Sequence, residues 1–170
     1  MRTLSIDTAR AEDLGAINDI YDHYIAHTAI TFDVEPRPMA WRREWFSKFE
    51  EHGPHRLLVA RAGDRVVGYA SSSPHRPRAA YDPSVETSVY LSNDRRGEGI
   101  GSALYETLLR LLEAEDVHRA LAGITMPNPA SVALHEKFGY RHVGTFTEQG
   151  RKFGRYWDVA WYERAVPLTP

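Results

Sequence analysis

The glycine-rich segment Arg95–Ser102 constrains the fold most, because it joins two stretches of different periodicity. Before it, SVETSVYLS has the β-branched and aromatic content of a strand. After it, Ile100, Leu104 and Leu108 recur at helical spacing, which predicts a long amphipathic helix. Glycines at such a junction let the backbone approach a ligand, and a helix start favours an anion such as a phosphate or pyrophosphate. A plain glycine-rich turn is the alternative reading of the same residues.

The remaining chain has the patterns of a mixed α/β domain. Helices are predicted at about 11–28, 38–49, 100–116 and 128–139, and strands at 2–8, 56–62, 65–73, 84–92, 119–125, 140–150 and 153–166. In the second helix, Pro38 suits the first position, and Trp41, Trp45 and Phe49 are expected to form the buried face. No repeat or long linker divides this series, so we expect a single domain spanning residues 1–170.

Composition excludes several classes of protein. Lys and Arg number 21 against 23 Asp and Glu, and this formal charge of −2 argues against a bulk nucleic-acid or anionic-membrane binder. The absence of cysteine removes disulfides, thiolate metal sites and a cysteine nucleophile. No metal is expected, since His23 and His27 have zinc-ligand spacing without the glutamate of H-E-x-x-H. No apolar run approaches the ~20 residues of a membrane span, and MRTLSIDTARAEDL lacks the apolar region of a signal peptide. A cytoplasmic location is therefore predicted.

The spacing of the glycines distinguishes this loop from two well-known phosphate-binding loops. The chain has no Gly-Lys pair, which excludes a Walker loop, and G-x-G-x-G late in the chain does not fit a Rossmann fingerprint. Arg96–Gly101 instead fits [Q/R]-x-x-G-x-[G/A] and resembles the pyrophosphate loop of the GNAT N-acetyltransferase superfamily. Asn128–Tyr140 resembles the same superfamily's later motif, N-x-x-[AS]-x-x-[LF]-[YH] followed by K-x-G-[FY].

Longer stretches narrow this resemblance to one branch. IYDHYIAHTAITFDVEP, AYDPSVETSVYLSNDRRGEGIGSALYETLL and GRYWDVAWYER are similar to phosphinothricin acetyltransferases, whose relatives include acetyltransferases of methionine sulfoximine and methionine sulfone. The resemblance covers nearly the whole chain and is vaguest at Trp41–Phe49. It implies an α/β fold with a GNAT-like mixed, mostly antiparallel sheet that is splayed at its centre and flanked by helices. Acetyl-CoA would be the co-substrate, wedged in the gap.

The resemblance also implies the cofactor-binding residues. Backbone groups of Val89, Tyr90 and Leu91 would pair with the pantetheine arm as an added strand does, and Asn128 would hydrogen-bond the pantetheine region. The pyrophosphate would lie against the loop formed by Arg96, Gly97, Glu98, Gly99, Ile100, Gly101 and Ser102. Taken alone, Val89, Tyr90 and Leu91 are equally well core residues of a strand.

Two residues are candidates for catalysis. The acceptor amine must lose a proton before it attacks a thioester, and Glu86 occupies the position whose carboxylate has this role in the resembled branch. An outward-facing strand glutamate is the alternative. His135 stands where many superfamily members have a tyrosine and where histidine is usual in this branch. It could protonate the leaving thiolate, bind the polar substrate, or be a surface histidine of a helix face.

The predicted acceptor site is less sharply defined. Arg76 and Arg78 precede Tyr81 and could grip a substrate carboxylate, although a solvated basic loop is equally consistent. Phe32 and Glu35, on a loop expected to expose them, are also assigned to substrate binding.

The sequence therefore predicts an N-acetyltransferase that moves an acetyl group from acetyl-CoA to a small amino-acid-like amine by direct attack in a ternary complex. The alternatives are a non-catalytic acyl-CoA sensor and an acetyltransferase of protein N-termini or lysines. The physiological amine is not specified by the sequence. A homodimer is expected because the last strand carries more large aromatic side chains than one chain readily covers. These are Tyr156, Trp157, Trp161 and Tyr162. The resemblance implies the same, since members of that branch are dimers.

Overall fold

The computed structural model describes residues 4–167. Its strands are β1 (Leu4–Thr8), β2 (Leu57–Ala62), β3 (Arg65–Pro74), β4 (Ser84–Leu91), β5 (Arg119–Thr125), β6 (Arg141–Lys152) and β7 (Arg155–Ala165). Its α-helices are α1 (Leu14–His27), α2 (Met39–Phe46), α3 (Ile100–Leu112) and α4 (Pro129–Lys137), and short 3-10 helices occur at Ala11–Asp13, Ala79–Tyr81 and Asn93–Arg95. The predicted order of elements is confirmed. Positions 2–3 of the first predicted strand lie outside the described residues.

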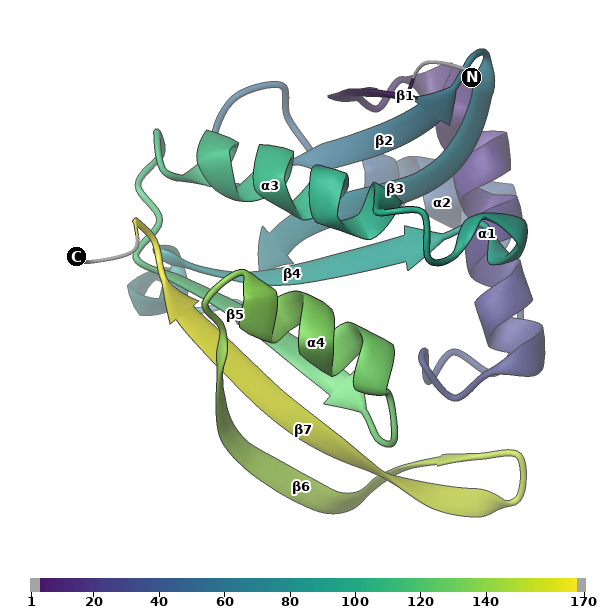
Figure 1. Cartoon of the computed structure of the whole chain (residues 1–170), viewed down its shortest axis with the longest axis vertical. Helices are drawn as coiled ribbons and strands as arrows, with labels where there is room; N and C mark the ends of the chain where they lie inside the picture. Colours follow the sequence, from purple (N-terminus) through teal and green to yellow (C-terminus); the bar gives the residue numbers. More distant parts are fainter. Residues whose placement is uncertain (1–3, 168–170) are drawn as a thin grey trace.

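All the strands form one sheet in the order β1-β2-β3-β4-β5-β7-β6. β4 and β5 are parallel and pair only between Ser84–Glu86 and Arg119–Leu121, whereas the other neighbouring pairs of the described sheet are antiparallel. Beyond Glu86 the two strands diverge, and the split is plain in Figure 1. The expected mostly antiparallel sheet that is splayed at its centre is therefore confirmed.

Helices cover both faces of this sheet. α3 and α4 lie in front of it in Figure 1, and α1 and α2 lie behind its right-hand end. Under α3, Leu104, Leu108 and Leu112 are completely buried in the larger core cluster. Under α1, Ile17 and Ile20 pack with Tyr69 of β3 in a second cluster. Burial of these apolar stripes on opposite faces fixes the sheet between two helical layers.

Local signals in the sequence set the ends of the elements nearest the split. The side chain of Asn128 accepts a hydrogen bond from the backbone N–H of Ser131 and so caps α4. Gly99, with φ of +79°, is the residue from which α3 begins. Both helix starts therefore lie where the sequence places them, next to the diverging strands.

The second helix differs from its prediction. α2 has only 8 residues, Phe49 lies beyond its end, Pro38 precedes it, and Trp41 is 39% exposed. The buried residue is Arg42, at 2% exposure, and its guanidinium lies over the rings of Tyr21, Trp41 and Trp45. A planar cation packs well on aromatic faces, so Trp41 and Trp45 cover an arginine. Trp45 and Phe49 are also partly buried against the second core cluster, as predicted. The prediction was wrong for Trp41 and for the extent of the helix, which ends before Phe49.

Phe32 is a second correction, because it is half-buried rather than exposed. Its ring occupies the space that a side chain at Gly150 of β6 would need. The buried Lys152 of the same strand donates a hydrogen bond from Nζ to the carbonyl of Thr31, at 2.8 Å. The end of the β6–β7 hairpin is thus packed against the loop that joins α1 to α2.

Among the described residues, no helix is long and apolar enough to cross a membrane.

Candidate active site

A cavity of about 450 Å³ opens between the end of β4 and the starts of α3 and α4. It brings together most of the residues predicted to bind a cofactor. These are Val89, Leu91, Arg96, Gly97, Gly99, Ile100, Gly101, Ser102 and Asn128. Two predicted residues do not line it. Tyr90 points to the other face of the sheet, where it packs on Tyr21 and Tyr24, and Glu98 forms an ion pair with Arg95 at 2.7 Å.

The loop at the start of α3 has the properties of an anion cradle. Gly97 and Gly99 have φ values of +81° and +79°, a conformation that other residues rarely adopt, and a Cβ at either would have nothing within 4 Å. The glycines are therefore required by the backbone conformation, and the space beside them is open. Arg96 and Lys137 supply positive charge, and the Lys137 Nζ donates to the Ser102 hydroxyl at 3.0 Å. With the helix start, these cations fit a diphosphate group.

The end of β4 presents backbone groups to the split. The N–H of Ser92 donates to the Val67 carbonyl on β3, so the N–H and C=O of the preceding residue, Leu91, face the other way. There the Tyr24 hydroxyl donates to the Leu91 carbonyl at 2.8 Å and accepts from the Leu91 N–H at 3.3 Å. By the same alternation, Val89 faces the split and Tyr90 does not. A pantetheine arm can therefore pair with Val89 directly, and with Leu91 where the arm replaces the Tyr24 hydroxyl.

Tyr24 is a site residue that the sequence analysis did not identify as one. It lines the cavity, and the guanidinium of Arg96 lies 5.3 Å from its ring centroid. In the predicted helix 11–28 it follows Ile17 and Tyr21 at helical spacing, which marks a core residue, and nothing local indicates that its hydroxyl reaches β4. Lys137 was also missed as a site residue, although it belongs to the K-x-G-[FY] motif.

Glu86 lies on the opposite face of the sheet from α3. Side chains alternate along β4, so Glu86 shares a face with Ser88 and Tyr90. Its side chain is 40% exposed, and its Oε2 lies 3.7 Å from the Nδ1 of His75. Burial raises the pKa of Glu86, and the neighbouring His75 opposes that rise. Glu86 is thus a partly shielded carboxylate at the point where β4 leaves β5, neither an ordinary solvent-facing strand residue nor a fully buried one.

His135 lies on the α3 side and is buried, at 3% exposure, so the surface alternative was wrong. Its Nδ1 lies 2.7 Å from the Ser131 carbonyl, which can only accept, so Nδ1 carries the proton. Its Nε2 then accepts a hydrogen bond from the Tyr105 hydroxyl at 2.8 Å. Burial lowers the pKa of His135, which favours the neutral ring.

A smaller cavity of about 50 Å³ leads toward His135. It shares Ile30, Val89, Asn128 and Ser131 with the larger cavity, and is also lined by Thr87. The Thr87 hydroxyl lies 2.7 Å from that of Tyr140 and 3.4 Å from that of Tyr105. His135 therefore belongs to a buried hydroxyl network at the inner end of the larger cavity, the candidate cofactor cavity.

The residues predicted to bind substrate are only partly brought together. Arg76 lies 5.7 Å from the ring centroid of Tyr81, and the ring of Tyr81 lies near that of His75, beside Glu86. Arg78 is exposed at the start of the Ala79–Tyr81 turn. Glu35 is exposed on the loop between α1 and α2, and Phe32 on that loop is held by the β6–β7 hairpin. Of these residues, Arg76 and Tyr81 contact His75 and so lie in the neighbourhood of Glu86.

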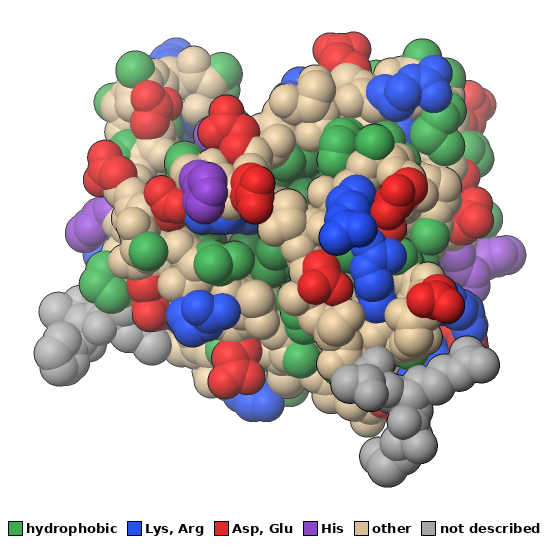
Figure 2. Space-filling model, turned by 90° about the horizontal axis from the view of Figure 1, so that it is seen from above, with side chains coloured by type: hydrophobic (Ala, Val, Ile, Leu, Met, Phe, Trp, Pro, Cys, Tyr) green, Lys and Arg blue, Asp and Glu red, His purple; other side chains and the backbone are tan. Residues whose placement is uncertain are grey.

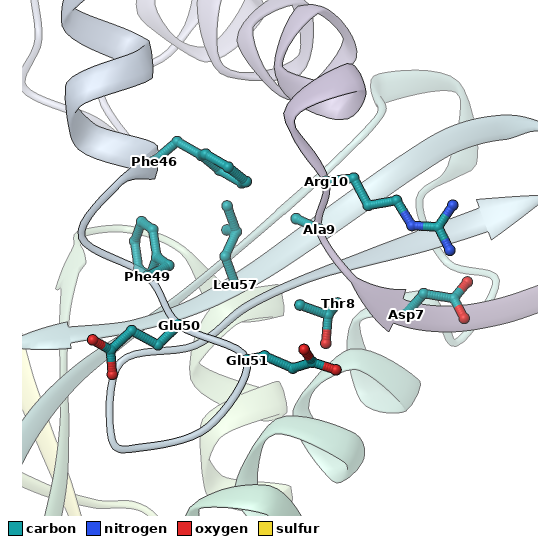
Figure 3. Close-up of a pocket in the computed structure, with 9 residues that line it drawn as sticks. All are labelled: Asp7, Thr8, Ala9, Arg10, Phe46, Phe49, Glu50, Glu51 and Leu57. Atoms are coloured by element: carbon teal, nitrogen blue, oxygen red, sulfur yellow. The ribbon is translucent and has the colours of Figure 1, made fainter.

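A separate cavity of about 460 Å³ lies between the end of β1 and the segment that follows α2 (Figure 3). Phe46, Phe49 and Leu57 form its apolar part, and Glu51 and Arg10 are at its rim. No residue predicted to bind cofactor or substrate lines it. Figure 2 shows acidic and basic side chains interspersed over the face of the molecule that is seen from above.

Comparison with known proteins agrees with this geometry. The Acetyltransferase (GNAT) family profile matches residues 17–140. Phosphinothricin N-acetyltransferase of Streptomyces coelicolor is 56% identical over 157 residues, covering 91% of this chain and 92% of the relative. L-methionine sulfoximine/L-methionine sulfone acetyltransferase of Pseudomonas aeruginosa is 33% identical over 165 residues, covering 97% and 96%. A GNAT superfamily phosphinothricin acetyltransferase from Sinorhizobium meliloti, solved in complex with acetyl-CoA, superposes with a TM-score of 0.89 at 34% identity, covering 96% and 89%.

A splayed sheet with a glycine-rich anion cradle at the split defines an acetyltransferase fold, and this chain belongs to the GNAT family. Its similarity to the phosphinothricin and methionine sulfoximine acetyltransferases extends over nearly its whole length. The chain is therefore an acetyltransferase enzyme, which removes the non-catalytic sensor alternative.

Proposed function

We propose that this enzyme transfers the acetyl group of acetyl-CoA to the amine of a small amino-acid-like acceptor of the phosphinothricin or methionine sulfoximine type. The observation that carries the proposal is the split between β4 and β5. The cofactor cavity lies on the α3 side of the split, and Glu86 lies on the other face of the same strand. An amine beside Glu86 can then attack a thioester reached through the gap.

Each residue has a defined part in this proposal. Acetyl-CoA supplies the activated acetyl group when it is bound. Arg96, Lys137 and the start of α3 hold its diphosphate, and Val89 and Leu91 pair with its pantetheine arm. Glu86 removes a proton from the acceptor amine. Because attack occurs in a ternary complex, no covalent acyl-enzyme is required, and the chain has no cysteine to form one.

His135 is assigned to the leaving group rather than to the acceptor. The alternation along β4 supports this choice, because His135 contacts residues on the α3 side and Glu86 lies on the other. A proton taken up at Nε2 would be returned to the thiolate there, along the hydrogen bond that joins Nε2 to the Tyr105 hydroxyl. Arg76 and Arg78 are assigned to the acceptor carboxylate, and Phe32, Glu35 and Tyr81 to the walls around the acceptor.

A panel of acceptors with acetyl-CoA tests this proposal. Phosphinothricin, methionine sulfoximine, methionine sulfone and ordinary amino acids would be compared with a peptide N-terminus and a lysine peptide. Release of CoA thiol is the measurement, and a protein without cysteine gives no thiol background. We expect the highest kcat/KM with a small amino-acid-like acceptor. Preference for a peptide would replace this acceptor class, and no transfer to any amine would overturn the proposed reaction.

We propose in addition that the enzyme acts as a homodimer in the cytoplasm. Support for the dimer is the exposed apolar surface of the edge strand β6 and its neighbour β7. Val143 and Phe146 of β6 are each 58% exposed, and Tyr156 of β7 is 55% exposed. Tyr162 does not contribute, because it is buried within the chain at 6% exposure.

A further inference from the structure

His75, the residue directly after β3, faces the carboxylate of Glu86. Its Nδ1 lies 3.7 Å from Glu86 Oε2, and its side chain is 14% exposed. The Nδ1 atom is itself buried and has no hydrogen-bond partner within residues 4–167. A buried ring nitrogen without a partner is unfavourable unless it serves another purpose, and here it lies just outside hydrogen-bond distance of the candidate base.

The hydrogen bond at the other ring nitrogen fixes which one carries the proton. The Nε of Arg76 donates to His75 Nε2 at 3.4 Å. Because arginine can only donate, Nε2 is the acceptor of the neutral ring and Nδ1 carries the hydrogen. The N–H therefore lies on the side of the ring that faces Glu86. A movement of either side chain by a few tenths of an ångström would complete the hydrogen bond from His75 Nδ1 to Glu86 Oε2.

Aromatic residues outside β3 and β4 fix the orientation of the His75 imidazole ring. Tyr81 and Trp161 meet it edge-on, with centroid distances of 6.2 Å and 5.9 Å and interplanar angles of 78° and 75°. Trp161 of β7 is itself fixed against β5, since a Cβ at Gly123 would lie 3.3 Å from the indole ring. The imidazole is thus held by side chains on both sides of the split and cannot turn freely away from Glu86.

We infer that His75 is a positioning residue for the acetyl transfer, holding the Glu86 carboxylate ionised and directed toward the acceptor amine. The inference rests on the proposed function. Burial alone raises the pKa of Glu86, and His75 is the neighbour that lowers it. The other titratable or charged groups beside the pair are Arg76, Tyr81 and Tyr90. His75 thereby lets a partly desolvated carboxylate stay a base, with enough shielding from water to interact strongly with the amine.

The test removes the N–H and keeps the packing. His75→Phe retains a ring between Tyr81 and Trp161, and His75→Asn retains a donor close to the position of Nδ1. Glu86 acts only when ionised, so kcat/KM falls on the acid side as the pH drops through its pKa. Without His75 that pKa rises, and we expect the acid side of the kcat/KM profile for the acceptor to move to higher pH in His75→Phe. His75→Asn keeps a donor but no charge, so its acid limb should lie between those of the wild type and His75→Phe.

Two controls separate positioning from folding. His118→Phe makes the same substitution at an exposed histidine outside the site and should leave the limb unchanged. In a Glu86→Gln background, His75→Phe should cause no further loss of kcat, since its effect passes through the carboxylate. KM for acetyl-CoA should be the same in all variants. If His75→Phe does not fold, His75→Met provides a flexible apolar replacement.

The outcomes are distinct. If kcat/KM of a folded His75→Phe or His75→Met enzyme falls at the same acid pH as in the wild type, the inference is overturned and the proposed function stays intact. An equal further loss of kcat in the Glu86→Gln background would also overturn it. Wild-type enzyme that transfers acetyl to no amine would overturn the proposed function itself.

Discussion

Alternation along β4 decides the part that each of its residues can take. Val89 and Leu91 direct backbone groups to the split, and Thr87 joins the buried hydroxyl network on the α3 side. Glu86 points to the opposite face, where His75 meets it. A shift of one residue would turn the Glu86 side chain to the α3 face, so the register with β3 (Ser73 opposite Glu86) is a condition of the proposed chemistry.

Glu86→Gln tests the base directly. Glutamine keeps the shape and the hydrogen-bonding capacity but cannot take a proton from the amine. Turnover should fall by about 10²–10⁴-fold, with acetyl-CoA binding unchanged. The loss should shrink at high pH, where more of the amine is already unprotonated. The measurement is a pH–rate profile of both proteins beside a thermal melt; equal profiles with a lower melting temperature would make Glu86 a structural residue.

Among the elements, those with strong local signals could be predicted from the sequence. β5 has the predicted bounds Arg119–Thr125, and α4 lies between Asn128 and Gly139 as its cap and its glycine indicate. α2 could not be predicted correctly, because the burial of Arg42 depends on Tyr21 from another helix. The same limit explains the missed Tyr24, since its bond to Leu91 joins residues 67 positions apart. Long-range contacts of this kind leave no periodicity in the sequence.

The β6–β7 hairpin supports the loop between α1 and α2, and glycine at one position makes that possible. In Gly150→Ala the added Cβ would overlap the ring of Phe32. We expect a loss of about 1–3 kcal/mol in the free energy of unfolding, as for an overpacked contact. If Phe32 forms part of the acceptor wall, KM for the acceptor should rise while KM for acetyl-CoA stays unchanged.

Gly144→Ala is the matched control for that substitution, in the same strand. A Cβ at Gly144 would have nothing within 4 Å. Its effect on unfolding, measured by denaturant titration, should be small. Equal stability of the two variants would show that the contact between Gly150 and Phe32 does not hold the loop.

At the scale of the whole molecule, the sheet separates the two binding tasks of the proposed function. The cofactor cavity and His135 lie on the face covered by α3 and α4, and Glu86 with His75 lies on the face of α1. The split between β4 and β5 is the point at which a group can pass from one face to the other. Each substrate can therefore be bound by its own set of elements while the reacting atoms meet at the gap.

The two outer strands of the sheet differ in a way that predicts how copies of the chain associate. Within the described residues β1 has 5 residues, whereas β6 has 12 and exposes Val143 and Phe146. A long edge strand with exposed apolar side chains readily associates with another chain, so we expect light scattering at micromolar concentration to give the mass of two chains. Phe146→Glu should reduce it to the mass of one, because a carboxylate would be buried in the interface. Leu4→Glu, on the opposite outer strand, should leave the dimer intact. A wild-type mass of one chain would contradict the prediction, and equal effects of the two variants would place the interface elsewhere.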